Sequence, residues 1–256
     1  MHTERIPVEV PTRAPTGDTA CYVLGESGAL VVDPPAADTR IESELHRVAH
    51  VAVTHHHPDH VGAVADVAEA VDATVWCRRG RADAFAAATG VDPDREFAGG
   101  TAIPTGEGPV LVRDTPGHAP EHVAFETPVA LVAGDLAVAD GSVVVGWPEG
   151  DMRAYLASLR RVRGLAPDRL LPGHGPVIDD PPATCERLIR HRLDREARVR
   201  DAVRDGARDV ADIVEAAYEK DLTGVRDLAA ATVRAHLEKL AIEGRVRWNG
   251  DRAVPA

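Results

Sequence analysis

Residues 54–60 read Thr54-His55-His56-His57-Pro58-Asp59-His60, and they follow a short apolar, β-branched run over residues 50–54 that predicts a buried strand. Further along the chain, three residues of the same chemical kind stand in glycine-containing turns: His118, Asp135 and His174. Imidazole nitrogens and carboxylates bind zinc and neighbouring divalent metals. With His55, His57, Asp59 and His60 of the run they make seven such groups, which exceed what one tetrahedral site can use, so the sequence predicts a site for two metal ions.

The histidine-rich run lies between the predicted strand and a helix predicted over residues 60–70. Residues two apart in an extended chain point the same way, so His55 and His57 can face one metal while the residue between them faces away. Asp59 and His60, at the start of the helix, turn toward a second position. The plainer interpretations are a nonspecific metal-chelating tract and a carboxylate that only caps the helix.

These motifs resemble those of the metallo-β-lactamase superfamily, whose pattern is His-x-His-x-Asp-His followed by a single His, a single Asp and a final His. The match spans roughly residues 17–180. The resemblance implies that His55, His57 and His118 hold the first metal, that Asp59, His60 and His174 hold the second, and that Asp135 bridges them. Asp33 matches an acidic residue of the family that supports a ligand histidine. The alternative is that it is only a carboxylate in a turn at the end of a strand. His122 is a candidate for contact with the substrate or for support of a ligand. The alternative is an ordinary histidine in a loop.

The resemblance implies an α/β fold, the αββα sandwich, in which two mixed sheets lie face to face with helices outside and the metals at one edge. We expect this catalytic domain over residues 1–180 and a separate module over residues 181–256. Near residue 180 the chain becomes turn-rich and then helical, which is typical of a domain boundary.

Helical periodicity marks three segments of the C-terminal module, about residues 183–204, 210–217 and 233–240. Asn249-Gly250-Asp251 then separates two short strands, a strong hairpin signal. Three helices and a hairpin predict a winged helix. The module resembles the tail of a β-lactamase-like subgroup that includes a mitochondrial single-strand endoribonuclease and thioesterases acting with polyketide synthases.

The metals determine the expected chemistry. Two divalent ions lower the pKa of a shared water from about 16 towards about 7, so we expect a metal-bridging hydroxide as nucleophile. Asp59 is placed to orient it and to carry its proton. We expect zinc, with iron or manganese as alternatives, and a thioester or small ester as substrate. Antibiotic-hydrolysing members of the superfamily commonly have Cys or Ser in place of Asp135, and diiron flavoproteins have Glu in place of His57, so both activities are disfavoured. Within the superfamily the sequence resembles the glyoxalase II-like hydrolases.

Three other functions remain as alternatives. Eight arginines between residues 187 and 208 favour an endoribonuclease acting on single-stranded RNA, unless they pair with acidic residues on neighbouring helical turns. An iron persulfide dioxygenase shares much of the first motif and would hold one iron. A DNA-binding regulator would not need seven ordered ligands. The winged helix could also cover the site or form a homodimer, and it replaces the glutathione-binding tail of glyoxalase II.

Composition predicts a cytoplasmic enzyme with no membrane span and no signal peptide. The 29 basic residues include only two lysines, and they face 41 acidic residues, for a net charge of -12. Residues 1–180 hold 14 basic and 27 acidic residues, so the acidity lies in the catalytic domain. Such a lysine-poor, acidic surface predicts a halophilic protein. The three cysteines lack metal-site spacing and are predicted to be buried apolar residues.

Overall fold

The computed structural model describes all 256 residues, which divide into two compact units. The first unit comprises Met1–Thr115, Glu121–Gly141 and Ala166–Pro181, and the second comprises Pro116–Pro120, Ser142–Leu165 and Pro182–Ala256. The second unit thus contains two segments from within the expected catalytic domain, besides the C-terminal residues. The domain boundary expected at residue 180 stays a prediction.

The first unit contains two mixed sheets. In the first sheet, β1 to β6 follow one another in chain order, antiparallel from β1 to β3 and parallel from β3 to β6. In the second sheet the order is β11-β10-β9-β8-β7, with only β10 and β11 parallel. The strands are β1 Thr3–Glu9, β2 Asp18–Leu24, β3 Ala29–Val32, β4 Val48–Ala52, β5 Thr74–Arg78, β6 Arg95–Phe97, β7 Ala102–Ile103, β8 Val110–Asp114, β9 Val123–Glu126, β10 Leu131–Gly134 and β11 Leu170–Pro172.

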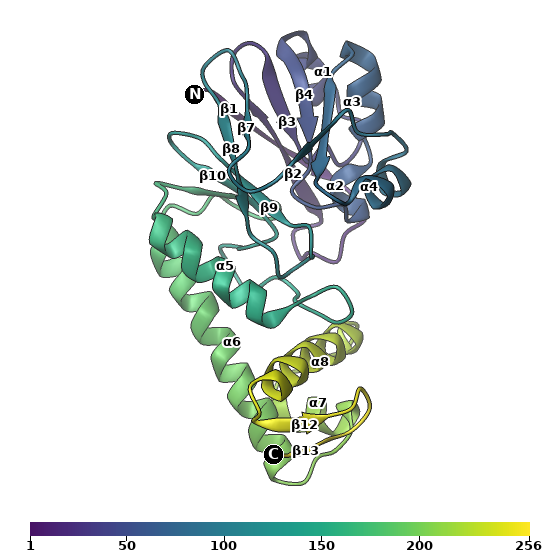
Figure 1. The fold of residues 1–256 in the computed structure, drawn as a ribbon, viewed down its shortest axis with the longest axis vertical. Coiled ribbons are helices and arrows are strands. Elements are labelled where there is room, and N and C mark those ends of the chain that lie inside the picture. Colours follow the sequence, from purple (N-terminus) through teal and green to yellow (C-terminus); the bar gives the residue numbers. More distant parts are fainter. The chain divides into compact units, whose positions relative to one another are not determined.

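Alternating side chains of the first sheet build two cores. One face contributes Tyr22 and Leu30, which belong to the same buried cluster as Val112 and Phe125 of the second sheet, so the two sheets pack face to face. The opposite face packs against helices, as Figure 1 shows for α1 and α3 beside β3 and β4. Each fully buried side chain of this size contributes about 1.5–3 kcal/mol. The helical segments of this unit are α1 Thr39–Glu44, η1 Leu45–Arg47, α2 Pro58–Val61, α3 Val64–Val71 and α4 Ala82–Thr89.

Parallel neighbours bring the predicted site residues to one edge of each sheet. Asp33 follows β3, and the histidine-rich run follows β4, its parallel neighbour. In the second sheet, Asp135 follows β10 and His174 lies two residues after β11, again a parallel neighbour. Because parallel strands end on the same side, each pair of segments leaves its sheet at the same edge.

The single helix predicted over residues 60–70 is wrong. The segment forms the one-turn helix α2, which begins at Pro58, and the separate helix α3. Between them, the Ala63 N–H donates to the Pro34 carbonyl instead of continuing the helix. A Cβ at position 62 would lie 2.3 Å from the Pro35 carbonyl oxygen, so only glycine fits there. The segment after β3 therefore breaks the helix, and Asp59 and His60 lie in a separate turn.

The second unit contains the predicted winged helix. Residues of α6, α7, α8 and the hairpin share one buried cluster that includes Val203, Ile213, Leu237 and Val246, which confirms the predicted arrangement of three helices and a hairpin (Figure 1). The Asn249 side chain accepts hydrogen bonds from the backbone N–H groups of Asp251 and Arg252 and closes the hairpin. The elements are α5 Met152–Leu165, α6 Pro181–Arg204, α7 Val210–Ala217, α8 Arg226–Ile242, β12 Val246–Trp248 and β13 Ala253–Pro255.

Two arginines of α6 are buried and contact other segments of the second unit, and others form ion pairs along the helix. Arg192 and Arg195 are buried and donate to the carbonyls of Val143 and Ala217. Others form ion pairs, as in Arg204 with Asp201 and Asp205 and Arg190 with Glu186. The expected pairing with acidic residues on neighbouring turns is thus observed for part of the helix. Two further arginines instead donate hydrogen bonds to backbone carbonyls.

The cysteines behave as predicted. Cys21, Cys77 and Cys185 are free and buried, and burial raises the pKa of the Cys77 and Cys185 thiols to about 11. Such thiols are poor nucleophiles at neutral pH. Among the helices, none combines the length and the apolarity that a membrane crossing requires.

Candidate metal centre

Thr54 fixes the ring of His55. The Thr54 N–H and hydroxyl both donate to the Asp33 carboxylate, at 2.6 and 2.7 Å. Because the hydroxyl proton is used there, Thr54 Oγ1 accepts from His55 Nδ1, 3.0 Å away. Nε2 of His55 therefore carries the lone pair, and it faces Nδ1 of His57 at 3.0 Å. These contacts leave both histidines suited to ligate a metal.

Asp33 also orients His60. The carboxylate is 1% exposed and lies 3.1 Å from His60 Nδ1, which donates to it. His60 Nε2 then carries the lone pair; it is buried and makes no hydrogen bond, although the Asp135 carboxylate lies 3.5 Å away. A buried nitrogen without a hydrogen-bond partner is costly unless it binds something else. The position fits a metal ligand.

Asp135 and His174 meet at the ends of β10 and β11. His174 Nδ1 donates to the Asp18 carbonyl at 2.7 Å, and its Nε2 lies 3.4 Å from the Asp135 carboxylate and 3.7 Å from that of Asp59. A Cβ at Gly173 would lie 2.7 Å from the same Asp135 oxygen and 2.8 Å from the His60 ring. Glycine at this position therefore keeps the space among these side chains open.

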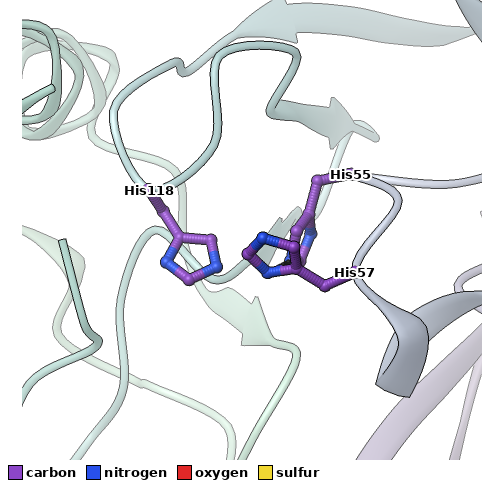
Figure 2. Close-up of side chains that lie close together, drawn as sticks. All are labelled: His55, His57 and His118. Carbon is purple, nitrogen blue, oxygen red and sulfur yellow. Dashed lines mark hydrogen bonds between the residues drawn. The ribbon is translucent and has the colours of Figure 1, made fainter. Parts of the chain in front are cut away.

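The structure brings all seven predicted ligands into three overlapping groups. Within each group, one ligand atom per residue lies within 4.8 Å of the others. Figure 2 shows the group that contains His118, whose ring lies near those of the two histidines from the loop after β4. The groups are His55, His57 and His118; His55, His60 and Asp135; and Asp59, His60 and His174.

His118 is held within the second unit. Its Nδ1 donates to the Val144 carbonyl at 2.6 Å, so the lone pair is on Nε2. The preceding Gly117 has a φ of 141°, and a Cβ there would lie 2.3 Å from the backbone of Tyr155 in α5. The close approach of α5 to this turn thus requires glycine beside the histidine.

Carboxylates make the centre favourable for positive charge. Burial lowers the pKa of His60, but the nearby Asp135, Asp33 and Asp59 outweigh burial and raise the pKa overall. Burial likewise opposes protonation of His174, yet Asp135, the Asp18 carbonyl and Asp59 raise its pKa to about 9. The same field that retains protons attracts divalent cations, which compete for the same nitrogens. The donor set and its electrostatics both fit a pair of divalent cations.

His122 lies behind Asp135. It is 1% exposed; Nε2 accepts from the Asp135 N–H at 3.0 Å, and Nδ1 donates to the Thr115 hydroxyl at 2.9 Å. His122 therefore contacts the backbone of Asp135, and its role in supporting a ligand stays a prediction.

Three supporting contacts were not anticipated from the sequence. Thr12 donates to Asp59 at 2.6 Å, and the Asp18 carbonyl accepts from His174. Buried Glu121 lies 3.3 Å from Nδ1 of His56, so the middle histidine of the run does face away from the ligand groups. Glu121 lies beside His122 in the sequence and could have been considered, whereas nothing in the sequence singles out Thr12.

Two family models match this chain. The model of the metallo-beta-lactamase superfamily matches residues 14–174, and that of the beta-lactamase associated winged helix domain matches residues 210–253. A beta-lactamase-like protein 2 homolog from Drosophila melanogaster is 30% identical over 249 residues, which cover 90% of this chain and 84% of that protein. Thioesterase pkgB from Emericella nidulans is 34% identical over 155 residues, covering 59% of this chain and 42% of that protein.

A solved structure shares the fold over nearly the whole chain. A metallo-beta-lactamase family protein from Thermus thermophilus has a TM-score of 0.79 at 23% identity, covering 99% of this chain and 98% of that one. The likeness supports the predicted fold class, including the C-terminal winged helix. With the ordered ligand set and a family match over more than half of its length, the chain belongs to the metallo-beta-lactamase superfamily.

Proposed function

We propose that the protein is a dinuclear metal-dependent hydrolase that cleaves a thioester or a related small ester. The observation that carries the proposal is that the Asp135 carboxylate lies in one group with His55 and His60, which belong to the ligand sets of two different cations. A buried carboxylate between two imidazoles suits a group shared by two cations. Membership of a superfamily of hydrolases supports the reaction class.

The proposed ligands follow the observed groups. His55, His57 and His118 would hold one cation, Asp59, His60 and His174 the other, with Asp135 shared by both. We propose zinc, since imidazole and carboxylate donors suit it, although the same donors accept iron or manganese. Bound in pairs, such cations supply Lewis acidity that activates water and polarises the scissile carbonyl.

The protein's own side chains would supply orientation and proton transfer. Asp59 would hold the attacking water and take up its proton, because its carboxylate lies beside His174 and is held by Thr12. Asp33 would keep Nε2 of His60 directed into the site, and His122 would fix the backbone of Asp135. The burial of His55, His60 and Asp135 would exclude bulk water and strengthen these interactions.

The substrate class is inferred from a named relative and from the contacts of the α6 arginines. The relative named as a thioesterase supports a thioester, and that similarity covers 59% of this chain. For single-stranded RNA, the arginines of α6 were the favourable feature, and several of them are engaged in buried hydrogen bonds and ion pairs. The ligand groups exceed the needs of a single iron, which disfavours the persulfide dioxygenase.

The host conditions are also part of the proposal. The three free, buried cysteines support a reducing, cytoplasmic setting, because disulfides form mainly in oxidising compartments. The acidic, lysine-poor composition supports activity in a salt-rich cytoplasm.

The test is turnover by metal-reconstituted protein on a panel of acyl-thioesters, beside fluorescent single-stranded RNA and a persulfide with oxygen monitoring. Metal content is measured on the same samples. We expect two metal ions per chain and thioester cleavage that is lost in Asp135→Ala, with circular dichroism unchanged. RNA cleavage lost in that variant would reverse the substrate assignment. One iron per chain with oxygen consumption would overturn the hydrolase assignment.

A further inference from the structure

The loop between β1 and β2, residues 10–17, lies beside the metal centre. β1 and β2 are antiparallel neighbours paired up to Glu9 and Asp18, so a two-residue turn could have joined them. Instead, eight residues form a loop closed by hydrogen bonds from Val10 to Gly17 and from Gly17 to Ala14. A longer, internally bonded loop at a strand end is a common place for functional residues.

Thr12 in this loop is bonded on both sides of its hydroxyl. Oγ1 accepts from the Ala14 N–H at 3.1 Å and donates to Oδ2 of Asp59 at 2.6 Å. The backbone N–H can only donate, so it leaves the hydroxyl proton directed at the carboxylate. Oδ2 is also the Asp59 oxygen that lies 3.7 Å from His174 Nε2. Thr12 therefore restricts rotation of the carboxylate that faces His174.

The end of the loop holds a second ligand of the same group. Asp18, the first residue of β2, accepts from His174 Nδ1 through its carbonyl at 2.7 Å. The Ala20 N–H donates to the Gly173 carbonyl at 2.8 Å, which anchors the turn that carries His174. Two members of the group Asp59, His60 and His174 are thus oriented from residues 12–20.

We infer that Thr12 is a positioning residue for the second metal position. The inference rests on the proposed dinuclear function and deepens it, because it assigns the orientation of Asp59 to the β1–β2 loop. A purely local role is the competing explanation: a threonine that accepts from the N–H two residues on stabilises a turn without affecting any ligand. The two explanations predict different metal affinities for a protein without the hydroxyl. The positioning role predicts weaker binding of one of the two metals, and the local role predicts no change in either.

The experiment is a zinc titration of the full-length, metal-stripped protein against a chromophoric chelator, for wild type, Thr12→Val and Thr12→Ser. We expect wild type to bind two equivalents. Thr12→Val, which keeps the shape but loses the hydroxyl, should keep one equivalent at wild-type affinity and bind the other about 10- to 100-fold more weakly. Thr12→Ser restores a hydroxyl and should recover most of that loss.

Thr127→Val is the matched control. The Thr127 hydroxyl also accepts from the backbone of its own turn, at Val129 and Ala130, and bonds the Ala130 carbonyl. This variant should lose thermal stability and still bind both equivalents as wild type does. Thr12→Ala serves as a second removal of the hydroxyl, with thermal unfolding recorded for every protein.

Equal binding of both equivalents by wild type and Thr12→Val would overturn the inference, and so would an equal loss in Thr127→Val. If wild type itself binds fewer than two equivalents, the dinuclear proposal and this inference both fail. Two bound equivalents without thioester turnover would sink the substrate assignment alone, and the titration would still decide the role of Thr12.

Discussion

Nε2 of His122 accepts a hydrogen bond from the backbone N–H of Asp135 at 3.0 Å, inside the protein. A backbone N–H can only donate, so Nε2 is unprotonated. The ring proton is therefore on Nδ1, which donates a hydrogen bond to the Thr115 hydroxyl. The neutral ring thus joins the turn after β8 to the turn after β10. Its position sets the backbone of the carboxylate proposed to be shared by two metals.

Replacing His122 by Ala should lower both stability and metal binding. The Asp135 N–H would remain buried without its acceptor, which costs about 1–3 kcal/mol. Denaturant unfolding and metal content measure the two effects, and the loss of metal should reduce turnover further. His46→Ala, at an exposed histidine, is the control and should behave as wild type. An unchanged His122→Ala protein would show that the ring is dispensable for Asp135.

Asp33→Asn tests the group that orients His60. Asp33 has a φ of 53°, a conformation that Asn also tolerates, so the backbone should not change. The amide has one acceptor oxygen where the carboxylate has two, so it cannot serve both Thr54 and His60 as well. We expect one metal to bind about 10- to 100-fold more weakly in an equilibrium competition assay.

Asp72→Asn is the matched control for that variant. Asp72 also has a positive φ, 51°, but lies exposed at the end of α3. Its substitution should leave both metal affinities unchanged. A similar loss of affinity in both variants would mean that Asp33 acts through general stability and not through His60.

The raised pKa of His174 predicts how the metal-free protein responds to pH. Its pKa is about 9 in the folded state, above the ordinary 6.5, so the folded state retains the proton more tightly than the unfolded one. The resulting stability is fully present below pH 6.5 and is lost as the pH rises through about 9. Denaturant unfolding of metal-free protein should show this decline, and His174→Gln should flatten it. A wild-type curve that rises across this window would contradict the assignment.

Part of this architecture could be predicted from sequence because metal chemistry limits the choice of residues. Histidines and aspartates placed at strand ends have few structural reasons to occur in that order, so the sequence could predict a metal site and, through the family resemblance, the two mixed sheets. Helical periodicity and the hairpin signal predicted the winged helix. The break at Gly62 was not, because it depends on Pro35, which is distant in sequence from the helix it interrupts. Thr12 was missed for the same reason, since its partner Asp59 lies 47 residues away and a threonine in a loop carries no pattern.

Arg192→Met should destabilise the second unit and weaken metal binding at His118. Arg192 is buried, donates to the Val143 carbonyl and lies 5.5 Å above the Tyr155 ring. Removing it leaves a buried carbonyl without that donor, a loss of about 1–3 kcal/mol. The carbonyl of the next residue, Val144, accepts a hydrogen bond from His118 Nδ1. A shift of the backbone at Val143 should therefore also displace the His118 ring.

Arg204→Ala provides the comparison on the same helix. Its ion pairs with Asp201 and Asp205 are exposed, and such pairs contribute only about 0–1 kcal/mol. Urea unfolding and metal titration of both variants separate a buried structural arginine from a surface one. If Arg204→Ala instead abolished RNA cleavage in an active preparation, the endoribonuclease alternative would gain its first direct support.

Salt should stabilise the protein, and mainly through residues 1–180. That region carries 27 acidic against 14 basic residues, whereas residues 181–256 carry 14 against 15, so self-repulsion is concentrated in one part of the chain. At about 1 M potassium chloride the screening length falls to about 3 Å, which removes most repulsion between surface carboxylates. The melting midpoint should rise by at least about 3 °C, the shift that roughly 1 kcal/mol produces in a chain of this size. Hydrogen exchange should show the gain in peptides from residues 1–180, and a midpoint indifferent to salt would reject the halophilic interpretation.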